Sequence, residues 1–224
     1  MQDEYFHRRG PAAFLWQSLG NQLRYPKGAA GRLVGRAMSK VNRLPYRAAI
    51  DALEVQPGDH ILELGFGPGR GLAELSTHGR GGHVYGIDQS PDMLQQASNL
   101  NALAINAGRM TLALGQFNPL PWHGDSFDRL LMVNVAYFFD RDGADIREAY
   151  RVLRPGGRAV IYVTARWTME RWPFCEPDTH RTFDVAALEQ LLLQGGFIAD
   201  DITFRFPDFP FGVSGILAVA SKLR

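Results

Sequence analysis

Cysteine, long apolar runs and an excess of either charge are the features that this sequence most clearly lacks. Its single cysteine, Cys175, excludes an internal disulfide and a zinc cluster built from cysteines, and it suits a reducing compartment. Its six histidines show no ligand spacing such as HExxH, so we expect no metal site. Lys and Arg number 24 against 23 Asp and Glu, which gives no electrostatic reason to expect a nucleic-acid partner.

The hydrophobic stretches are all too short to cross a membrane, since none approaches the roughly 18 uninterrupted apolar residues of a transmembrane helix. The first residues, Met1–Glu4, carry acids where an export signal is basic. We therefore expect a cytoplasmic protein. The length of 224 residues and the 46% hydrophobic content indicate one α/β domain with a sizeable core.

From residue 59 onward, short apolar runs alternate with helical patterns. The expected strands are 60–64, 83–87, 110–114, 128–134 and 158–164, and the helices between them are 70–78, 91–106 and 142–153. This alternation predicts βαβ units and a parallel sheet. After a helix at 184–194, strands at 198–206 and 214–221 are joined by so few residues that they must run antiparallel.

Residues 1–54 precede this pattern, and we expect them to form a helical arm packed on a core domain of residues 55–224. Helices are expected at 12–23 and 31–53, with Pro45 starting a new helix in its first turn. One face carries a basic stripe, comprising Arg32, Arg36, Lys40, Arg43 and Arg47. The other face is apolar and comprises Leu33, Ala37, Val41, Leu44 and Ala48. The basic stripe is either a solvated helix face or a surface for anionic lipid or an anionic substrate.

The stretch "ILELGFGPGRG", residues 61–71, joins an expected strand to an expected helix. Such a turn lies at the carboxyl edge of a parallel sheet, where small ligands bind. The dinucleotide fingerprint GxGxxG fails, because its third glycine would fall at Arg70 or Leu72, and no Gly-Lys-Ser/Thr of a P-loop follows. What stands here is an acid, Glu63, two residues before the first of three alternate glycines.

This motif resembles the first motif of the class I S-adenosylmethionine-dependent methyltransferases. Over about residues 55 to 220 the chain is similar to their small-molecule branch, which includes ubiquinone and menaquinone methyltransferases. The resemblance implies a Rossmann-like doubly wound α/β fold, with a seven-stranded sheet that is mostly parallel and ends in an antiparallel hairpin. It also implies S-adenosylmethionine as cofactor and S-adenosylhomocysteine as product. In that family the acid meets the methionine end of the cofactor, and the glycines let the chain pass close beneath it.

Three further stretches strengthen the resemblance. Asp88 ends the second expected strand, about 20 residues after the glycines, where a carboxylate chelates a ribose diol. "GQFNPLPWHGDSFD" resembles the family's adenine-binding stretch, with Gln116 and Phe117 in place of the usual Asp and Ala. "LRPGGR", at 153–158, matches the structural turn into the fifth strand. The implied cofactor-binding residues are Glu63, Gly65, Phe66, Gly67, Gly69, Asp88, Gln89, Met93, Gln116, Phe117, Asn134 and Val135.

Methyl transfer is an in-line displacement in which the cofactor supplies the reactive group and the protein supplies alignment and, where needed, a base. "MVNVAYFF" after the fourth strand lacks the NPPY motif of amide- and adenine-methylating relatives, which argues against a nucleic-acid base or a glutamine as target. The candidate catalytic residues are His180 and Tyr137, followed by His123 and Tyr25. For each of them the alternative is a residue that lines the substrate pocket or a satisfied surface group.

The segments outside the common core, 165–183 and "FRFPDFPFG", are rich in Trp, Phe and Pro. They favour transfer to O or N of a small apolar or aromatic molecule. One alternative is a phospholipid or quinone methyltransferase at a membrane surface, which the basic stripe would contact. Another is a catalytically inactive protein that binds the cofactor and serves as an interaction partner, although the intact Glu63, glycines and Asp88 disfavour it. We expect a small-molecule methyl acceptor and no nucleic acid.

Overall fold

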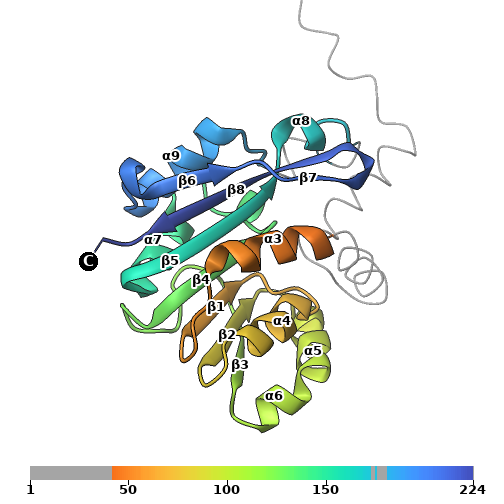
Figure 1. Cartoon of the computed structure of the whole chain (residues 1–224), viewed down its shortest axis with the longest axis vertical. Helices are drawn as coiled ribbons and strands as arrows, with labels where there is room; N and C mark the ends of the chain where they lie inside the picture. Colours follow the sequence, from red (N-terminus) through yellow and green to blue (C-terminus); the bar gives the residue numbers. More distant parts are fainter. Residues whose placement is uncertain (1–41, 173–174, 176–180, 224) are drawn as a thin grey trace, which may run out of the picture.

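The computed structural model describes residues 42–172, 175 and 181–223 of the chain. A single sheet runs through this part, and helices cover both of its faces (Figure 1). The strands are β1 His60–Leu64, β2 His83–Asp88, β3 Met110–Leu114, β4 Phe127–Val133, β5 Leu153–Thr164, β6 Ile202–Arg205, β7 Asp208–Phe209 and β8 Val213–Ser221. The α-helices are α3 Arg43–Leu53, α4 Arg70–His78, α5 Pro91–Leu100, α6 Ala102–Asn106, α7 Ala144–Val152, α8 Arg166–Met169 and α9 Val185–Gly195. The 3-10 helices are η1 Ala136–Phe138, η2 Ala199–Asp201 and η3 Pro210–Gly212.

The strand order is β3-β2-β1-β4-β5-β8-β6, with β7 paired to β8. Strands β1 to β5 are parallel, and β8 runs antiparallel to both β5 and β6. The predicted doubly wound sheet with a C-terminal antiparallel hairpin is therefore confirmed. The sheet has one strand more than the predicted seven, because the short β7 forms inside the connection expected to be a plain turn. The chain reverses direction across the sheet between β1 and β4, and such a switch point is where ligands bind in doubly wound folds.

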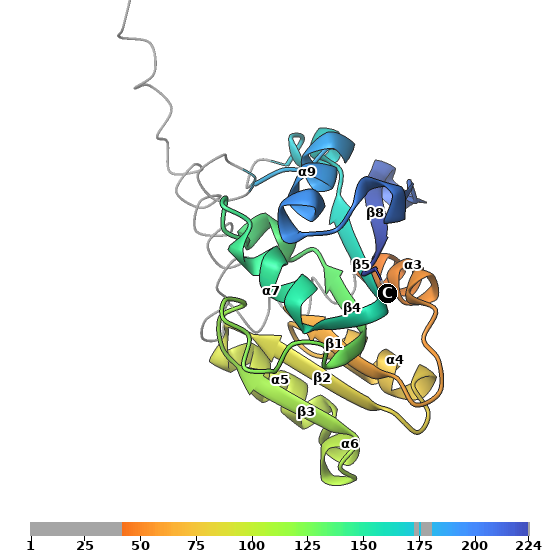
Figure 2. The same ribbon diagram turned by 90° about the vertical axis from the view of Figure 1, so that its left-hand side faces the viewer.

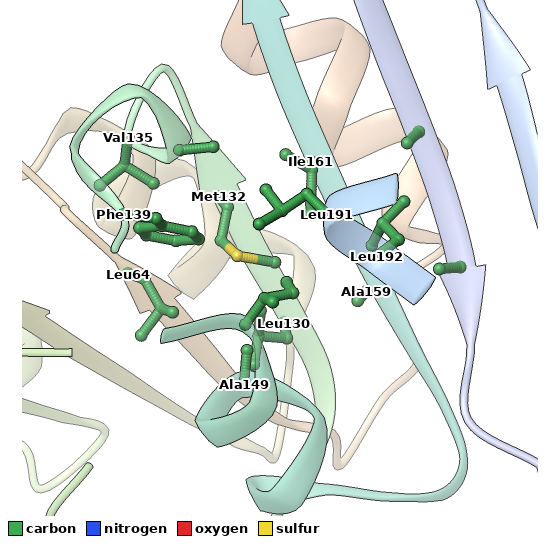
Figure 3. Packing of buried hydrophobic residues seen from close by; sticks show 14 of the residues in the cluster. Leu64, Leu130, Met132, Val135, Phe139, Ala149, Ala159, Ile161, Leu191 and Leu192 are labelled. Atoms are coloured by element: carbon green, nitrogen blue, oxygen red, sulfur yellow. The ribbon is translucent and has the colours of Figure 1, made fainter. Parts of the chain in front are cut away.

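The side chains of each strand alternate between two hydrophobic layers. Leu130 and Met132 of β4 and Ile161 of β5 pack with α7 and α9, as Figure 3 shows. The intervening residues of the same strands, such as Leu131 and Val160, pack with α3, α4 and α5. Figure 2 shows α7 and α9 on one side of the sheet and α3 and α4 on the other. This alternation decides into which layer each functional side chain points.

Three predicted boundaries are wrong. The helix expected at 91–106 is interrupted at Asn101, whose side-chain Nδ2 donates to the Gly69 and Ala97 carbonyls. Strand β5 starts at Leu153 rather than at residue 158, because Gly156 and Gly157 exchange backbone hydrogen bonds with Lys222 beyond β8. Strand β6 starts only at Ile202, because a 3-10 turn takes the residues expected to begin it.

Helix α3 is the described part of the predicted N-terminal arm, and Pro45 lies in its first turn as predicted. The buried residues of α3 are Pro45, Ala49, Ile50, Ala52 and Leu53, and the helix packs across β4 and β5 (Figure 1). Leu44 is 42% exposed, so its place on a buried apolar face is wrong, whereas Ala48 of the same expected face packs partly buried against the core. The division of the chain at residue 54 stays a prediction.

Two members of the predicted basic stripe, Arg43 and Arg47, are exposed on α3. The Nε atom of Arg47 lies 3.9 Å from Oε1 of Glu74 on α4. Arg32, Arg36 and Lys40 lie outside the described residues, as do the expected helix at 12–23 and Tyr25. Contact of the stripe with an anionic membrane therefore stays a prediction. Among the described helices, none combines the length and the apolar character needed to cross a bilayer.

Candidate functional site

The glycine turn joins β1 to α4 at the carboxyl edge of the sheet, beside the switch point. Gly65, Gly67 and Gly69 all have left-handed backbone conformations, with φ of 71°, 52° and 84°. Other residues adopt these angles at a cost, which explains the alternating glycines. The Gly65 N–H donates to the Ile87 carbonyl at 2.8 Å and so fixes the turn to the end of β2.

The three glycines differ in what a side chain would meet. A Cβ at Gly65 would lie 2.5 Å from Cγ2 of Val135, and a Cβ at Gly69 would lie 2.7 Å from Cβ of Ala97. These two glycines therefore allow the turn to pack closely against Val135, just after β4, and against Ala97 of α5. A Cβ at Gly67 would meet no protein atom within 4 Å. Among the three glycines of the turn, Gly67 is thus the one beside which the described residues leave open space at the carboxyl edge of the sheet.

Glu63 is fully buried on β1 and points into the layer that contains α3 and α4. Its Oε1 accepts a hydrogen bond of 2.7 Å from the hydroxyl of Tyr46 on α3. Its Oε2 is buried and has no hydrogen-bond partner in the part of the chain that the structure describes. Burial raises the pKa of Glu63 to about 8, against the opposing effect of the Tyr46 hydrogen bond and with a smaller contribution from Asp88. An unpaired buried carboxylate oxygen fits a cationic donor such as an ammonium group.

Tyr46 is a site residue that sequence analysis missed. Its ring occupies the space beside Gly71, where a Cβ would collide with both the Tyr46 ring and the Glu63 carboxylate. Burial and the neighbouring Glu63 raise the pKa of Tyr46 well above its ordinary value, so its hydroxyl stays a donor. The sequence held one indication of this contact, a further glycine at 71 directly after the glycine motif. A glycine there leaves room for a bulky side chain from elsewhere in the chain, but the sequence does not say which side chain it is.

Asp88 stands at the end of β2 and holds the glycine turn in place. Its Oδ2 accepts from the Gly67 N–H at 2.8 Å, and its Oδ1 accepts from the Ser90 N–H at 2.9 Å. Burial raises the pKa of Asp88, while these backbone N–H groups oppose the change. Each carboxylate oxygen can accept a further hydrogen bond, so the geometry is compatible with the predicted chelation of a diol.

The other predicted cofactor residues separate into two groups. Gln116 and Phe117 follow β3 and Gln89 follows β2, so their positions lie along the same carboxyl edge. Gln116 is exposed, whereas Phe117 is buried against Phe139 with 5.8 Å between the ring centroids. The side chains of Phe66 and Met93 belong instead to the hydrophobic layer beneath α4 and α5.

Phe66 and Met93 have at most 2% of their surface exposed. The Phe66 ring fills the space beside Gly86, where a Cβ would lie 2.7 Å from it. Their side chains are therefore part of the core, which leaves the backbone of these residues for any contact with a cofactor, and their binding role stays a prediction.

Asn134 and Tyr137 hold the ends of β4 and β5 together. Asn134 has a left-handed φ of 54°, and its Oδ1 accepts from the Tyr137 hydroxyl at 2.7 Å. The Thr164 N–H donates to the same hydroxyl at 2.5 Å. Burial raises the pKa of Tyr137 above its ordinary value. A hydroxyl that is buried, hard to ionise and engaged on both sides is a poor general base, so the geometry argues against the predicted catalytic role of Tyr137.

The predicted histidine bases are not part of the described site. His123 is exposed in the loop that precedes β4. That loop runs to the amino edge of β4, opposite to the glycine turn, and the position of His123 near its end disfavours a role as base there. His180 and Tyr25 lie outside the described residues, and their roles stay predictions. Within the described ranges, no group of three metal-ligating side chains comes together.

The part of the chain that contains the glycine motif is similar in sequence to known proteins. Residues 62–161 match the methyltransferase domain family. The uncharacterized methyltransferase YdaC of Bacillus subtilis is 30% identical over 134 residues, which cover 60% of this chain and 72% of that protein. An uncharacterized 37.1 kDa protein in a transposon of Streptomyces fradiae is 36% identical over 176 residues, or 78% of this chain and 50% of that protein.

Two further similarities concern a named enzyme and a solved structure. The ubiquinone/menaquinone biosynthesis C-methyltransferase UbiE of Geotalea daltonii is 29% identical over 123 residues, covering 54% of this chain and 52% of that protein. This chain thus spans about half the length of the Streptomyces and Geotalea relatives. A phosphoethanolamine N-methyltransferase of Haemonchus contortus, solved with S-adenosylhomocysteine, superposes with a TM-score of 0.72 at 14% identity, over 93% of this chain and 60% of that one. This last likeness concerns the fold alone.

Proposed function

The chain belongs to the S-adenosylmethionine-dependent methyltransferases, and we propose that it transfers the methyl group of this cofactor to O or N of a small apolar or aromatic molecule. Its match to the Bacillus methyltransferase, at 30% identity over 72% of that protein, supports the family. The observation that carries the assignment of the site is the open space at Gly67, between two residues that offer carboxylate oxygens, Glu63 and Asp88.

The site residues fit the cofactor group by group. The unpartnered Oε2 of Glu63 would accept from the ammonium of the methionine end. The backbone at Gly67 would pass beneath the cofactor, and the carboxylate of Asp88 would accept from the ribose diol. Gln116 would receive the adenine amino group at the end of β3. Bound there, the cofactor supplies a methyl group on a sulfonium, and these residues hold and orient it.

Aromatic rings support an apolar acceptor. Phe117 and Phe139 stack edge to face at the ends of β3 and β4, and the ring centroids of Tyr137 and Phe183 are 6.1 Å apart. Phe183 pairs with Ala165, directly after β5, so the segment beyond α8 returns to the same edge of the sheet. These rings are buried, with at most 8% of their surface exposed, so they make this edge of the sheet apolar and exclude water from it.

Methyl transfer is tested with S-adenosylmethionine labelled in its methyl group and a panel of phenols, hydroquinones and aromatic amines. We expect label in at least one of these small molecules and none in tRNA, DNA or a glutamine-containing peptide. Label found only in nucleic acid or protein would contradict the proposal.

Affinity for S-adenosylhomocysteine is expected to increase as the pH rises from about 6 to about 8. Burial raises the pKa of Glu63 to about 8, so below that pH the carboxyl is mostly protonated and must lose a proton before it accepts from the ammonium. This cost lowers affinity by at most about tenfold per pH unit below 8. Calorimetric titrations at several pH values measure the slope.

Glu63→Gln is the matched variant for this slope. It keeps the shape of the side chain but cannot ionise, so we expect weaker binding at pH 8 and a nearly flat profile below it. Asp88, whose pKa burial also raises, stays intact in the variant and accounts for any slope that remains. A wild-type affinity that does not change between pH 6 and 8, or an unchanged slope in the variant, would contradict the role of Glu63.

A further inference from the structure

Arg181 places a guanidinium at the acceptor side of the site, where it has no ion-pair partner among the described residues. Its backbone N–H donates to the Tyr137 carbonyl at 3.3 Å, just beyond the end of β4. Its guanidinium carbon lies 4.9 Å from the centroid of the Phe183 ring. Its Nη1 is buried and has no hydrogen-bond partner within the described part of the chain. A buried guanidinium nitrogen that donates to nothing is costly unless a ligand accepts from it.

A second guanidinium increases the positive charge at this place. Burial and the nearby Arg141 both lower the pKa of Arg181, although an arginine remains charged at neutral pH. Two described carboxylates close by in the sequence are engaged elsewhere: Oδ2 of Asp184 lies 2.7 Å from Arg166, and Oδ2 of Asp142 lies 3.8 Å from Arg147. Among the described residues, Arg181 and Arg141 form no ion pair of 4.0 Å or less.

We propose that Arg181, assisted by Arg141, binds an oxyanion carried by the methyl acceptor, either a carboxylate or a phosphate. A guanidinium presents parallel N–H donors that match both groups. Packing against the buried Phe183 ring holds the plane of the guanidinium. The acceptor is then an aromatic or apolar molecule with an anionic group at one end. This deepens the proposed function and rests on it.

The position of Arg181 relative to the cofactor residues fits this assignment. Val135 packs against Gly65 of the glycine turn, and Tyr137 follows two residues later. The Tyr137 carbonyl in turn accepts from Arg181. The oxyanion site therefore lies on the β4 side of the turn, apart from Glu63 and Asp88, which are assigned to the cofactor. An anion held there fixes one end of the acceptor and leaves its other end to meet the methyl group.

Binding of small probes tests the oxyanion site without any methyl transfer. Benzoate, phenyl phosphate and neutral benzamide are titrated into the full chain by calorimetry, with and without S-adenosylhomocysteine. We expect at least one of the two anions to bind ten times or more tightly than benzamide, and the stronger of them identifies the oxyanion. In Arg181→Gln this preference should fall to less than threefold, and in Arg181→Lys it should be intermediate. Arg109→Gln removes an exposed charge at the start of β3 and should keep the full preference.

The outcomes separate this inference from the proposed function. If S-adenosylhomocysteine binds but the wild type binds benzamide as tightly as both anions, the oxyanion site is refuted and the methyltransferase site stands. The oxyanion site is also refuted if both Arg181 variants keep the full preference for the anions over benzamide. If S-adenosylhomocysteine does not bind, the cofactor site is refuted, and the titrations without it still decide on Arg181. Should Arg181→Gln not fold, Arg181→Lys and Arg141→Gln carry the test, and each should reduce the preference.

Discussion

Gly67→Val is expected to abolish measurable binding of S-adenosylhomocysteine, a loss of at least about 100-fold, while the protein still folds. A Cβ at this position meets no atom of the described residues within 4 Å, so this part of the fold has room for it. That room is the space we assign to the cofactor, and two methyl groups there exclude a ligand that lies against the backbone. The left-handed φ of 52° adds strain of about 1–2 kcal/mol. Calorimetry gives the affinity, and thermal unfolding gives the stability.

Gly108→Val is the matched control. Gly108 has a similar φ of 66° and equally open space around its Cβ, but it lies before β3, at the opposite edge of the sheet. The two variants should therefore lose similar stability, and only Gly67→Val should lose binding. Equal binding by Gly67→Val and wild type would place the cofactor elsewhere. Loss of binding in both variants would show that strain, not exclusion, causes the effect.

Asp88→Ala is expected to weaken S-adenosylhomocysteine binding by about 2–4 kcal/mol, or roughly 30- to 1,000-fold. Two effects act in the same direction. The ribose diol loses a charged acceptor, and the N–H groups of Gly67 and Ser90 lose the carboxylate that anchors them at 2.8 Å and 2.9 Å. The glycine turn is then less well ordered before the cofactor arrives. Calorimetric affinity and thermal stability are again the two readouts.

Asp128→Ala is the matched control, because it also removes a carboxylate that accepts a hydrogen bond from a backbone N–H, but far from the glycine turn. Asp128 accepts from the His60 N–H at 2.8 Å and from Arg154 at 2.6 Å, at the amino edge of the sheet. Its replacement should cost stability and leave S-adenosylhomocysteine binding unchanged. Binding by Asp88→Ala within threefold of wild type would contradict the role of Asp88.

The sequence predicted features that depend on short stretches of backbone. The left-handed angles of Gly65, Gly67 and Gly69 are a local requirement, which the spacing of the glycines displays directly. The order of strands and helices followed in the same way from local periodicity and from the short connection before β8. These features fixed the fold class and the edge of the sheet at which the site lies.

Features that depend on packing between distant segments could not be read from the sequence. Tyr46 reaches Glu63 only because α3 crosses the sheet, and Phe66 turns into the core although it lies between two glycines of the motif. His123 is close in sequence to Gln116, but the chain crosses to the other edge of the sheet between them. Arg181 carried no motif at all, and the lack of a hydrogen-bond partner for its buried Nη1 among the described residues is visible only in three dimensions.

The central claim is that the glycine turn binds S-adenosylmethionine and not a dinucleotide. Calorimetric titration of the wild-type protein with S-adenosylhomocysteine and, separately, with NAD tests it most directly. We expect one site per chain with micromolar affinity for S-adenosylhomocysteine and no measurable heat with NAD. Binding of NAD without binding of S-adenosylhomocysteine would contradict it.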